Sequence, residues 1–411
     1  MFDITDPAQL GMDGGRLKRI DGYLKEHYLD SGRLPMTQLL VAREGKPVHY
    51  GMQGRMREDG TAMRDDAIFR LASMTKAVTC TAFMQLVEKC AVALEDPVAR
   101  VIPEFAKLGV YAGGGGAVPF APSQPARPMR FVDLMTHMSG LTYGFQNRTN
   151  VDAAYRQHNL DLARGEMDGD EYIAKLAAIP LDFQPGERWN YSVSHDVLGV
   201  AIERLSGMKL GEYFEKHIFA PLGMTDTAFH VPEGKLDRLV DAWAYQPGGA
   251  PKMIDPGASS RFASPAKFQG GGGGLAGTMA DYQRFVTMLA NRGSLDGARI
   301  VAPKTLALMT ANHLPGGKDL SQMSESLFSE ASNAGTGFGL GFATVIDPAR
   351  TLMPASMGEF YWGGAYSTAF FVDPVEAITM VFMTQLYPSN IYPLRRQLKT
   401  LIYAALNESR A

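Results

Sequence analysis

The spacing of hydrophobic residues changes from helical to strand-like within the first part of the chain. Over residues 14–29 apolar side chains recur every three or four positions, and Asp13 precedes them as a helix-capping residue type. Two short aliphatic runs follow at residues 38–42 and 48–51, on either side of a turn that contains Gly45. The pattern therefore predicts a helix and then a β-hairpin.

The rest of the chain divides into a mostly helical middle and a strand-rich end. Helical periodicity, broken by loops, runs over residues 96–256. Strand-like runs cover residues 339–346, 360–372 and 377–385, and a helix over 391–406 closes the chain. Because strands lie at both ends and helices between them, we expect an α/β (α+β) architecture, with an antiparallel sheet flanked by helices.

The chain has 411 residues, which is too many for one simple core, so two domains are expected. A composite α/β domain comprises residues 1–70 and 265–411, and a mainly helical domain comprises residues 71–264. The loop over residues 111–128 is rich in glycine and proline. It is either a surface excursion or one wall of an active-site mouth, and the sequence favours neither.

The most informative motif is S-x-x-K, formed by Ser73 and Lys76 after a strand-like run at residues 67–71. The motif opens a helix, because an apolar face continues over residues 78–90. A serine and a lysine three positions apart lie on one helical face, within hydrogen-bond reach of each other. The lysine can then take or relay the serine proton and activate its oxygen as a nucleophile, without a histidine.

The S-x-x-K pattern occurs three times, and the surrounding residues separate the three copies. Ser206 stands at the end of a predicted helix that Gly207 terminates. No long apolar face follows Ser264. Ser73 begins a core helix, but there it could serve only as the N-terminal cap. The motif alone leaves nucleophile and cap as alternatives.

Composition and charge argue against several classes of function. The formal net charge is −3 and there is no basic patch, so nucleic acid is not an expected partner. No apolar run could span a membrane, and the acidic N-terminus lacks the apolar core of a signal peptide. Cys80 and Cys90 fall on one predicted helix about 15 Å apart, too far for a disulfide. These features predict a cytoplasmic protein that does not bind a membrane.

Neither a metal nor an organic cofactor is expected. The sequence has no His, Cys and carboxylate cluster with metal-ligand spacing. The glycine run at residues 270–274 lacks the lysine of a phosphate-binding loop, and the one at 335–339 leads into a strand instead of a helix. The G-x-S-x-G motif of α/β-hydrolases is absent as well.

Acyl transfer by a serine also needs a group that handles the leaving-group proton, and Tyr191 is the candidate. It follows a Pro-Gly turn and precedes a predicted helix, so it lies in a loop. A lysine ammonium beside it would favour the ionised form and let it exchange a proton with a serine. Taken alone it would be an ordinary half-buried tyrosine. His195 is a competing base, although we expect it on a helix surface or at an interface.

Part of the oxyanion hole is predicted at Ala365, which follows the paired glycines Gly363 and Gly364 and Trp362 inside a predicted strand. Paired glycines in a strand often mark the close approach of a ligand or of another backbone. The N–H groups of Ala365 and Ser73 would then point to one carbonyl oxygen. The alternative is a bulged strand whose aromatic residue packs against the last helix.

Taken in their order along the chain, these motifs resemble those of the serine β-lactamase and penicillin-binding-protein superfamily. They look most like the class C β-lactamases and their esterase relatives, the family VIII carboxylesterases, and are similar to the fungal statin-side-chain acyltransferases. The resemblance spans residues 39–386 and includes segments 134–141, 221–224 and 272–275. It implies the serine β-lactamase-like fold, with the active site in the cleft between the two domains.

The resemblance implies a role for each matching residue. Ser73 matches the nucleophile of the family, Lys76 its partner, and Tyr191 the tyrosine of the Y-x-N motif. Ala365 follows the segment that occupies the place of the K-T-G motif of β-lactamases. The N–H groups of Ala365 and Ser73 would therefore form the oxyanion hole.

Two departures from the β-lactamase pattern bear on the substrate. Val193 stands where lactamases carry asparagine, and Trp362 stands where they carry lysine. Both lost groups would bind or orient the amide and carboxylate of a β-lactam, so efficient lactam hydrolysis is not expected. The sequence Trp362, Gly363, Gly364 resembles that of the esterases, and Tyr366 would add bulk to an apolar side of the substrate pocket.

The sequence therefore predicts a serine carboxylesterase that hydrolyses short-chain carboxylic esters through a Ser-Lys-Tyr acyl-enzyme. Its partner would be a small-molecule ester, and the sequence carries no signal for an oligomeric state. The alternatives are a class C-like β-lactamase or D-amino-acid peptidase, an acyltransferase to an alcohol other than water, and a catalytically silent acyl-binding homologue. Sustained turnover of a p-nitrophenyl ester would exclude the silent homologue.

Overall fold

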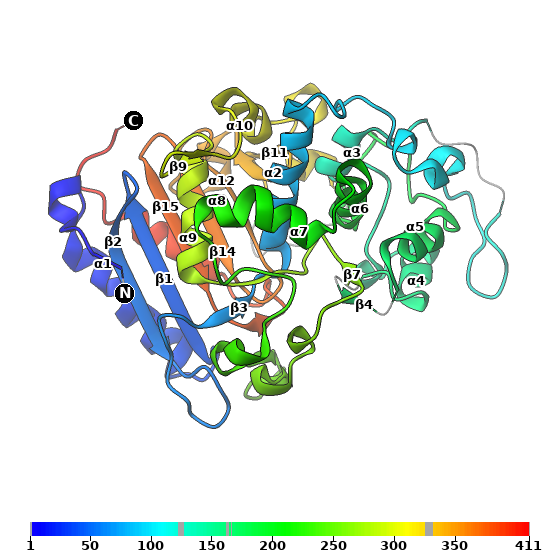
Figure 1. The fold of residues 1–411 in the computed structure, drawn as a ribbon. Coiled ribbons are helices and arrows are strands. Elements are labelled where there is room, and N and C mark those ends of the chain that lie inside the picture. Colours follow the sequence, from blue (N-terminus) through cyan, green and yellow to red (C-terminus); the bar gives the residue numbers. More distant parts are fainter. Residues whose placement is uncertain (1, 122–126, 162–163, 166, 325–331, 411) are drawn as a thin grey trace.

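The computed structural model describes residues 2–121, 127–161, 164–165, 167–324 and 332–410. Its largest sheet is formed by β1 (Met36–Arg43), β2 (Lys46–Gly54), β11 (Thr336–Phe338), β12 (Ala343–Val345), β13 (Phe360–Gly363), β14 (Ala369–Asp373) and β15 (Ile378–Met383). All neighbouring strands are antiparallel, in the order β11-β12-β13-β14-β15-β1-β2. The sheet occupies one side of the molecule, and a group of helices lies on the other (Figure 1).

The helices either cover the sheet or form the helical part of the molecule. They include α1 (Gly14–Leu24), α2 (Thr75–Glu88), α3 (Phe131–Met135), α4 (Asn150–Gln157), α5 (Gly169–Ala177), α6 (Ser194–Ser206), α7 (Leu210–Phe214), α8 (Ala220–Leu222), α9 (Met279–Ala290), α10 (Pro303–Thr310), α11 (Leu320–Met323), α12 (Pro348–Thr351) and α13 (Leu394–Tyr403). Helices α1, α9 and α13 cover the sheet, whereas α3 and α5 pack with α6 in the helical part.

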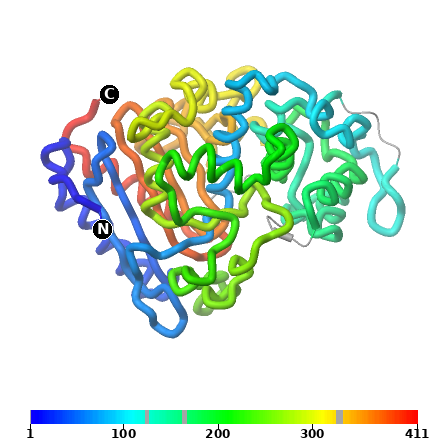
Figure 2. The backbone as a smooth tube through the Cα atoms, in the orientation of Figure 1, coloured from blue at the N-terminus to red at the C-terminus, as the bar shows by residue number. Residues whose placement is uncertain are grey.

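The sheet joins the two ends of the chain. β1 pairs with β2 in the predicted hairpin, and its other edge pairs with β15, where Gln38 lies opposite Met383. Every residue of β1 is buried, as expected for a central strand that is covered on both faces. The N-terminal and C-terminal segments also lie side by side, because Met12 bridges to Leu406 (Figure 2).

Helices lie on both faces of the sheet, as neighbouring residues of β14 show. Phe370 packs on Tyr282 of α9 with ring centroids 5.5 Å apart, and Phe371 stacks on Tyr403 of α13 at 6.0 Å. Successive strand residues point to opposite faces, so α9 and α13 lie on opposite sides of the sheet. The expected antiparallel sheet flanked by helices is therefore confirmed.

Helix α2 is the buried helix between the sheet and the helical part (Figure 1). All its residues from Thr75 to Leu86 are buried, and a helix that is buried on every side belongs to the interior of a protein. The short strand β3 (Ile68–Arg70), which pairs with β8 (Ala276–Thr278), leads into it. The side chain of Arg70 is 1% exposed and bonds to Asp255, which anchors the backbone just before the S-x-x-K motif.

The predicted elements are mostly confirmed, but the strand expected over residues 360–372 is wrong. It is two strands, β13 and β14, joined by a turn in which Ser367 has a φ of 67°. The strand expected over 339–346 is shorter, because Gly341 adopts a φ of 95° that extended backbone does not allow. Residues 264–267 form no helix, and α6 ends at Ser206 before the left-handed Gly207, as predicted.

The placement of Cys90 on the same helix as Cys80 is also wrong. Cys90 lies just beyond α2, is exposed and has a φ of 55°, so the helix has ended before it. Cys80 is buried, and neither cysteine forms a disulfide. Among the residues that the structure describes, none of the helices has the length and apolar character needed to cross a membrane.

Candidate active site

Ser73 lies in a tight turn at the start of α2. The residues Ala72–Met74 form a single 3-10 turn, and α2 continues from Thr75. Ala72 has a φ of 47°, a left-handed conformation that is uncommon for any residue except glycine. Strain of this kind costs of order 1–3 kcal/mol and is frequent at active sites. The turn directs the Ser73 hydroxyl into a cavity instead of the helix interior.

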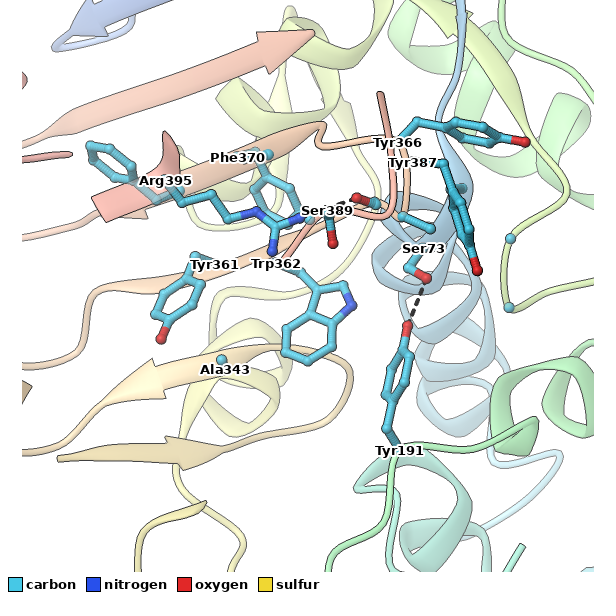
Figure 3. A pocket seen from close by; sticks show the side chains of 18 of the residues that line it. Ser73, Tyr191, Ala343, Tyr361, Trp362, Tyr366, Phe370, Tyr387, Ser389 and Arg395 are labelled. Carbon is cyan, nitrogen blue, oxygen red and sulfur yellow. Dashed lines mark hydrogen bonds between the residues drawn. The ribbon is translucent and has the colours of Figure 1, made fainter. Parts of the chain in front are cut away.

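The Ser73 hydroxyl accepts two hydrogen bonds from the residues that the sequence analysis selected. The Tyr191 hydroxyl donates to Ser73 Oγ at 2.6 Å, and Lys76 Nζ donates at 3.2 Å. Figure 3 shows the Tyr191 ring pointing its hydroxyl at Ser73 from the loop before α6. The structure therefore brings all three predicted residues together, although they come from two separate segments of the chain.

Lys76 is only 1% exposed, and its ammonium group has three acceptors. Besides Ser73 Oγ, Nζ donates to the Tyr143 hydroxyl at 3.1 Å and to the Gly272 carbonyl oxygen at 2.5 Å. An ammonium group has three donors, so this environment satisfies a charged lysine. Lys76 Nζ also lies 4.7 Å from the centroid of the Tyr191 ring, a favourable cation–π distance.

Sequence reasoning missed Tyr143 as a member of this network. Its hydroxyl is bonded to Lys76, and its ring lies 5.3 Å from that of Tyr191 and stacks on Phe145 at 4.7 Å. Burial, and then the charge of Asp196, raise the pKa of Tyr143, so its hydroxyl stays protonated. Nothing in its sequence context separates Tyr143 from an ordinary core tyrosine, because its position depends on how a distant loop folds.

The glycine run also contributes to the site, through its backbone. Gly272 offers its carbonyl oxygen to Lys76, and its N–H donates to Asp196 Oδ1 at 2.9 Å. A Cβ at Gly272 would lie 2.3 Å from Asp196 Oδ2, so the close approach requires glycine. The sequence analysis assigns residues 272–275 a place in the family resemblance but no contact with Lys76, and the glycines themselves are the one signal for this close approach.

Asp196 is a buried carboxylate linked to the lysine through Gly272, whose N–H bonds to Asp196 and whose carbonyl oxygen bonds to Lys76. It is 4% exposed and lines the cavity. Burial raises the pKa of Asp196 to about 6, although the Lys76 charge and the Gly272 N–H both oppose the shift. The carboxylate is therefore ionised above about pH 6 and carries a negative charge close to the ammonium group.

The turn after β13 lies against the backbone that precedes Ser73. A Cβ at Gly364 would lie 2.5 Å from the Leu71 carbonyl oxygen and 3.3 Å from the Ala72 Cβ. The close backbone approach expected from the paired glycines is thus confirmed. The Gly364 N–H bonds to the Thr368 carbonyl oxygen at 2.9 Å, so the next N–H along the chain is that of Ala365, which lines the cavity.

The cavity has a volume of about 520 Å³, and its lining combines aromatic side chains with charged ones such as Arg395 and Lys399. Trp362 lies 5.6 Å from Tyr191 and 5.4 Å from Phe338, measured between ring centroids. Tyr366 packs near Tyr387 on the other side of Ser73 (Figure 3). Six of the residues singled out in the sequence line this cavity, namely Ser73, Tyr191, Trp362, Gly363, Gly364 and Tyr366.

Other residues singled out in the sequence lie away from the cavity. Val193 is fully buried, donates its N–H to Thr142 and does not line the cavity. Of the loop 111–128, residues 122–126 lie outside the described part of the chain, and its remaining residues do not line the cavity. The charged groups His, Cys, Asp and Glu form no cluster that could hold a metal ion among the described residues.

The expectation that His195 lies on a helix surface is wrong. His195 is fully buried, 4.4 Å from His137 between ring centroids, and burial holds its pKa well below the usual range. Neither of its ring nitrogens has a hydrogen-bond partner among the described residues. His195 does not line the cavity, whereas His137 packs on the Tyr191 ring at 4.8 Å. The two histidines therefore support Tyr191 from behind.

The chain belongs to the β-lactamase family, whose model matches residues 24–403. It is 36% identical to protein Rv1367c of Mycobacterium tuberculosis over 364 residues, which cover 87% of this chain and 88% of the relative. It is 31% identical to esterase EstB of Burkholderia gladioli over 417 residues, which cover 97% and 98% of the two chains. The predicted resemblance to the β-lactamase superfamily and its esterases is thus confirmed.

A solved structure shows the same fold. EstCE1, described as a hydrolase with promiscuous acyltransferase activity, superimposes with a TM-score of 0.79. The match covers 96% of this chain and 99% of EstCE1, at 25% sequence identity. The serine β-lactamase-like fold is therefore confirmed over nearly the whole chain.

The raised pKa of Asp196 gives a prediction for the pH dependence of catalysis. We expect kcat/KM to fall as the pH drops through about 6, because protonation removes the carboxylate charge that faces Lys76. Asp196→Asn should be roughly tenfold less active at higher pH and lack this acid limb. The measurement is kcat/KM for p-nitrophenyl butyrate across the pH range. An unchanged acid limb in the variant would assign that limb to a group other than Asp196.

Proposed function

We propose that this chain is a serine carboxylesterase that hydrolyses short-chain carboxylic esters through an acyl-enzyme on Ser73. The observation that carries the proposal is the pair of hydrogen bonds on Ser73 Oγ, from Tyr191 at 2.6 Å and Lys76 at 3.2 Å, at the wall of an aromatic cavity. A hydroxyl with two proton-transfer groups in contact has the arrangement of an activated nucleophile. The esterase activity named for the relative EstB supports the same assignment.

In the proposed acylation step, the Lys76–Tyr191 pair acts with one proton fewer, as an ammonium group beside a phenolate oxygen. Ser73 Oγ attacks the carbonyl carbon of the ester while the Tyr191 oxygen takes the hydroxyl proton. The negative charge that develops on the carbonyl oxygen is held by the N–H groups of Ser73 and Ala365. As the tetrahedral intermediate collapses, the bond to the alcohol oxygen breaks and Tyr191 returns a proton to it. The products of this step are the free alcohol and an ester between the acyl group and Ser73.

In the proposed deacylation step, water replaces the alcohol and the same groups act again. The Lys76–Tyr191 pair accepts a proton from water as its oxygen attacks the acyl carbonyl. The bond to Ser73 Oγ then breaks, and the proton returns to the serine. Each group ends in its starting state, so the cycle balances without a metal or an organic cofactor. Tyr143 holds the Lys76 ammonium in place throughout, through the 3.1 Å hydrogen bond.

The cavity wall supports an ester as the substrate in preference to a β-lactam. Trp362 and Tyr366 line it and offer large apolar surfaces for an acyl or aryl group. Where β-lactamases carry a lysine for the lactam carboxylate, Trp362 places an indole. Val193 is buried and does not reach the cavity, so it supplies no contact to a lactam amide.

Acyl transfer to an alcohol is a second candidate activity, because it uses the same acyl-enzyme. The similar structure EstCE1 is described as a hydrolase with promiscuous acyltransferase activity. An alcohol that entered the cavity in place of water would be deprotonated by the same Lys76–Tyr191 pair and would leave as a new ester. Product analysis with p-nitrophenyl butyrate and added butanol separates the two outcomes, because transfer alone yields butyl butyrate.

We also propose a cytoplasmic location, on the basis of two unpaired cysteines, one of which is exposed. A free exposed thiol persists most readily in a reducing compartment. Cell fractionation with an antibody against the chain tests the proposal, and recovery from an oxidising compartment would contradict it.

Replacing Ser73 by alanine should abolish ester hydrolysis while the fold remains intact. The loss should be on the order of 10⁶ in kcat, because the nucleophile of a catalytic unit is removed. The measurement is the turnover of p-nitrophenyl butyrate by pure protein, with circular dichroism to confirm folding. Ser206→Ala and Ser264→Ala are matched controls that remove the other S-x-x-K serines and should stay active. More than a few per cent of wild-type turnover in Ser73→Ala would refute the assignment.

Lys76 and Tyr191 should act as one unit. Lys76→Ala, Tyr191→Phe and the double variant should lose similar amounts of kcat, because each change breaks the same proton path. Tyr191→Phe removes only the hydroxyl, so the packing on His137 and Trp362 should survive. The comparison is a double-mutant cycle on kcat. Losses that add in the double variant, or a fully active Tyr191→Phe, would remove Tyr191 from the mechanism.

Esters with short acyl chains should be far better substrates than β-lactams. A lactam carboxylate that meets the Trp362 indole in place of a lysine loses a charged partner, which should cost about 1–3 kcal/mol or more, roughly ten- to hundredfold or more in rate. The measurement is kcat/KM for p-nitrophenyl butyrate and for nitrocefin in one preparation. An equal or higher value for nitrocefin would favour a β-lactamase. A laurate ester that outperforms butyrate would contradict only the chain-length part.

A further inference from the structure

We infer that Arg395 is a positioning residue for the oxyanion hole, where it orients and polarises the Ala365 N–H through the Gly364 carbonyl group. The inference rests on the proposed function, because it assumes that Ala365 is an oxyanion donor. Arg395 lies on α13, and its side chain reaches over Trp362 toward the cavity (Figure 3). Sequence reasoning gave it no role, because the contact joins positions 31 residues apart.

The guanidinium group clamps both ends of the turn between β13 and β14. Arg395 Nη2 donates to the Gly364 carbonyl oxygen at 3.1 Å and to the Thr368 carbonyl oxygen at 3.2 Å. The turn itself is closed by two backbone bonds, from the Gly364 N–H to Thr368 O and from the Ser367 N–H to Gly364 O. One cation therefore holds the two carbonyl groups that fix the geometry of the turn.

The bond to Gly364 acts directly on the proposed oxyanion donor. The Gly364 carbonyl and the Ala365 N–H belong to one planar peptide group, so they cannot be oriented independently. A cationic donor on the carbonyl oxygen strengthens the N–H of the same peptide, because hydrogen bonds in a chain polarise one another. Arg395 thus places the Ala365 N–H and makes it a stronger donor.

The neighbouring glycine leaves the space that this contact requires. A Cβ at Gly363 would lie 2.5 Å from Arg395 Nη2 and 2.7 Å from its Cζ, so any larger residue would displace the guanidinium. Gly364 is needed for a different reason, the approach of its backbone to Leu71. The two glycines of the W-G-G sequence therefore have separate roles, one toward the nucleophile segment and one toward Arg395.

An oxyanion donor stabilises the transition state more than the bound ester, so the loss should appear in kcat. We expect Arg395→Met to lower kcat for p-nitrophenyl butyrate about ten- to hundredfold, less than the loss of a whole oxyanion donor. KM should stay within about twofold, because ground-state binding is unaffected. Phenylboronic acid, which forms a tetrahedral adduct on a serine, should bind weaker by the same factor as kcat/KM.

Two further variants control the experiment. Arg396→Met removes the neighbouring guanidinium, which bonds only to Leu352 in the described structure at 3.4 Å, and should keep wild-type kcat. Arg395→Lys keeps the charge, but its shorter and more flexible side chain would hold the two carbonyl groups less firmly than the fixed Nη2 does, so it should recover part of the kcat and of the boronate affinity. If Arg395→Met does not fold, Arg395→Lys alone decides, since an unchanged kcat and boronate affinity in it would overturn the inference.

The remaining outcomes are distinguishable. A raised KM with an unchanged kcat in Arg395→Met would overturn the inference and make Arg395 a substrate-binding residue. Equal losses of kcat in Arg395→Met and Arg396→Met would overturn it in favour of a general effect of α13. Failure of the proposed function itself would appear earlier, as a wild-type chain without turnover or a Ser73→Ala variant that keeps it.

Discussion

The architecture of the site depends on one buried cation. Lys76 is almost fully enclosed, and a charge that is removed from water is costly unless every donor is satisfied. Its three acceptors come from three parts of the chain, namely Ser73, Tyr143 and Gly272. Meeting this single requirement fixes the start of α2, the loop near residue 143 and the glycine run relative to one another. The Ser73 hydroxyl, the proposed nucleophile, is positioned as a consequence.

The sequence predicted those features that arise from local spacing. The S-x-x-K pair needed only helical geometry, and the hairpin and α2 followed from hydrophobic periodicity, so these were found. Tyr143 and Asp196 were missed because their positions depend on contacts between distant segments, which leave no periodic signal. The strand over 360–372 was predicted as continuous because aromatic and β-branched residues stand on both sides of its glycines, whereas the turn at Ser367 is stabilised by bonds from α13 and from the turn itself.

His195 shows the limit of residue-type reasoning. A histidine four positions after Tyr191 is easily taken for a catalytic base, and a place on a helix surface is the other usual interpretation of such a residue. The structure places it in neither role, because burial beside His137 disfavours its charged form. An uncharged imidazole pair can pack against the Tyr191 ring close to the Lys76 ammonium, whereas a second cation there would be repelled. A proposed mechanism in which neither histidine takes up a proton is thus consistent with the position of the Lys76 ammonium close to both of them.

The site separates the parts that perform chemistry from the parts that select a substrate. Lys76 is held largely by backbone and hydroxyl oxygens, and the proposed oxyanion donors are backbone N–H groups whose geometry Arg395 and the glycines set. The cavity wall, in contrast, consists of side chains such as Trp362 and Tyr366, which can be exchanged without moving that backbone. A fold arranged in this way can keep one acyl-enzyme mechanism while its wall changes.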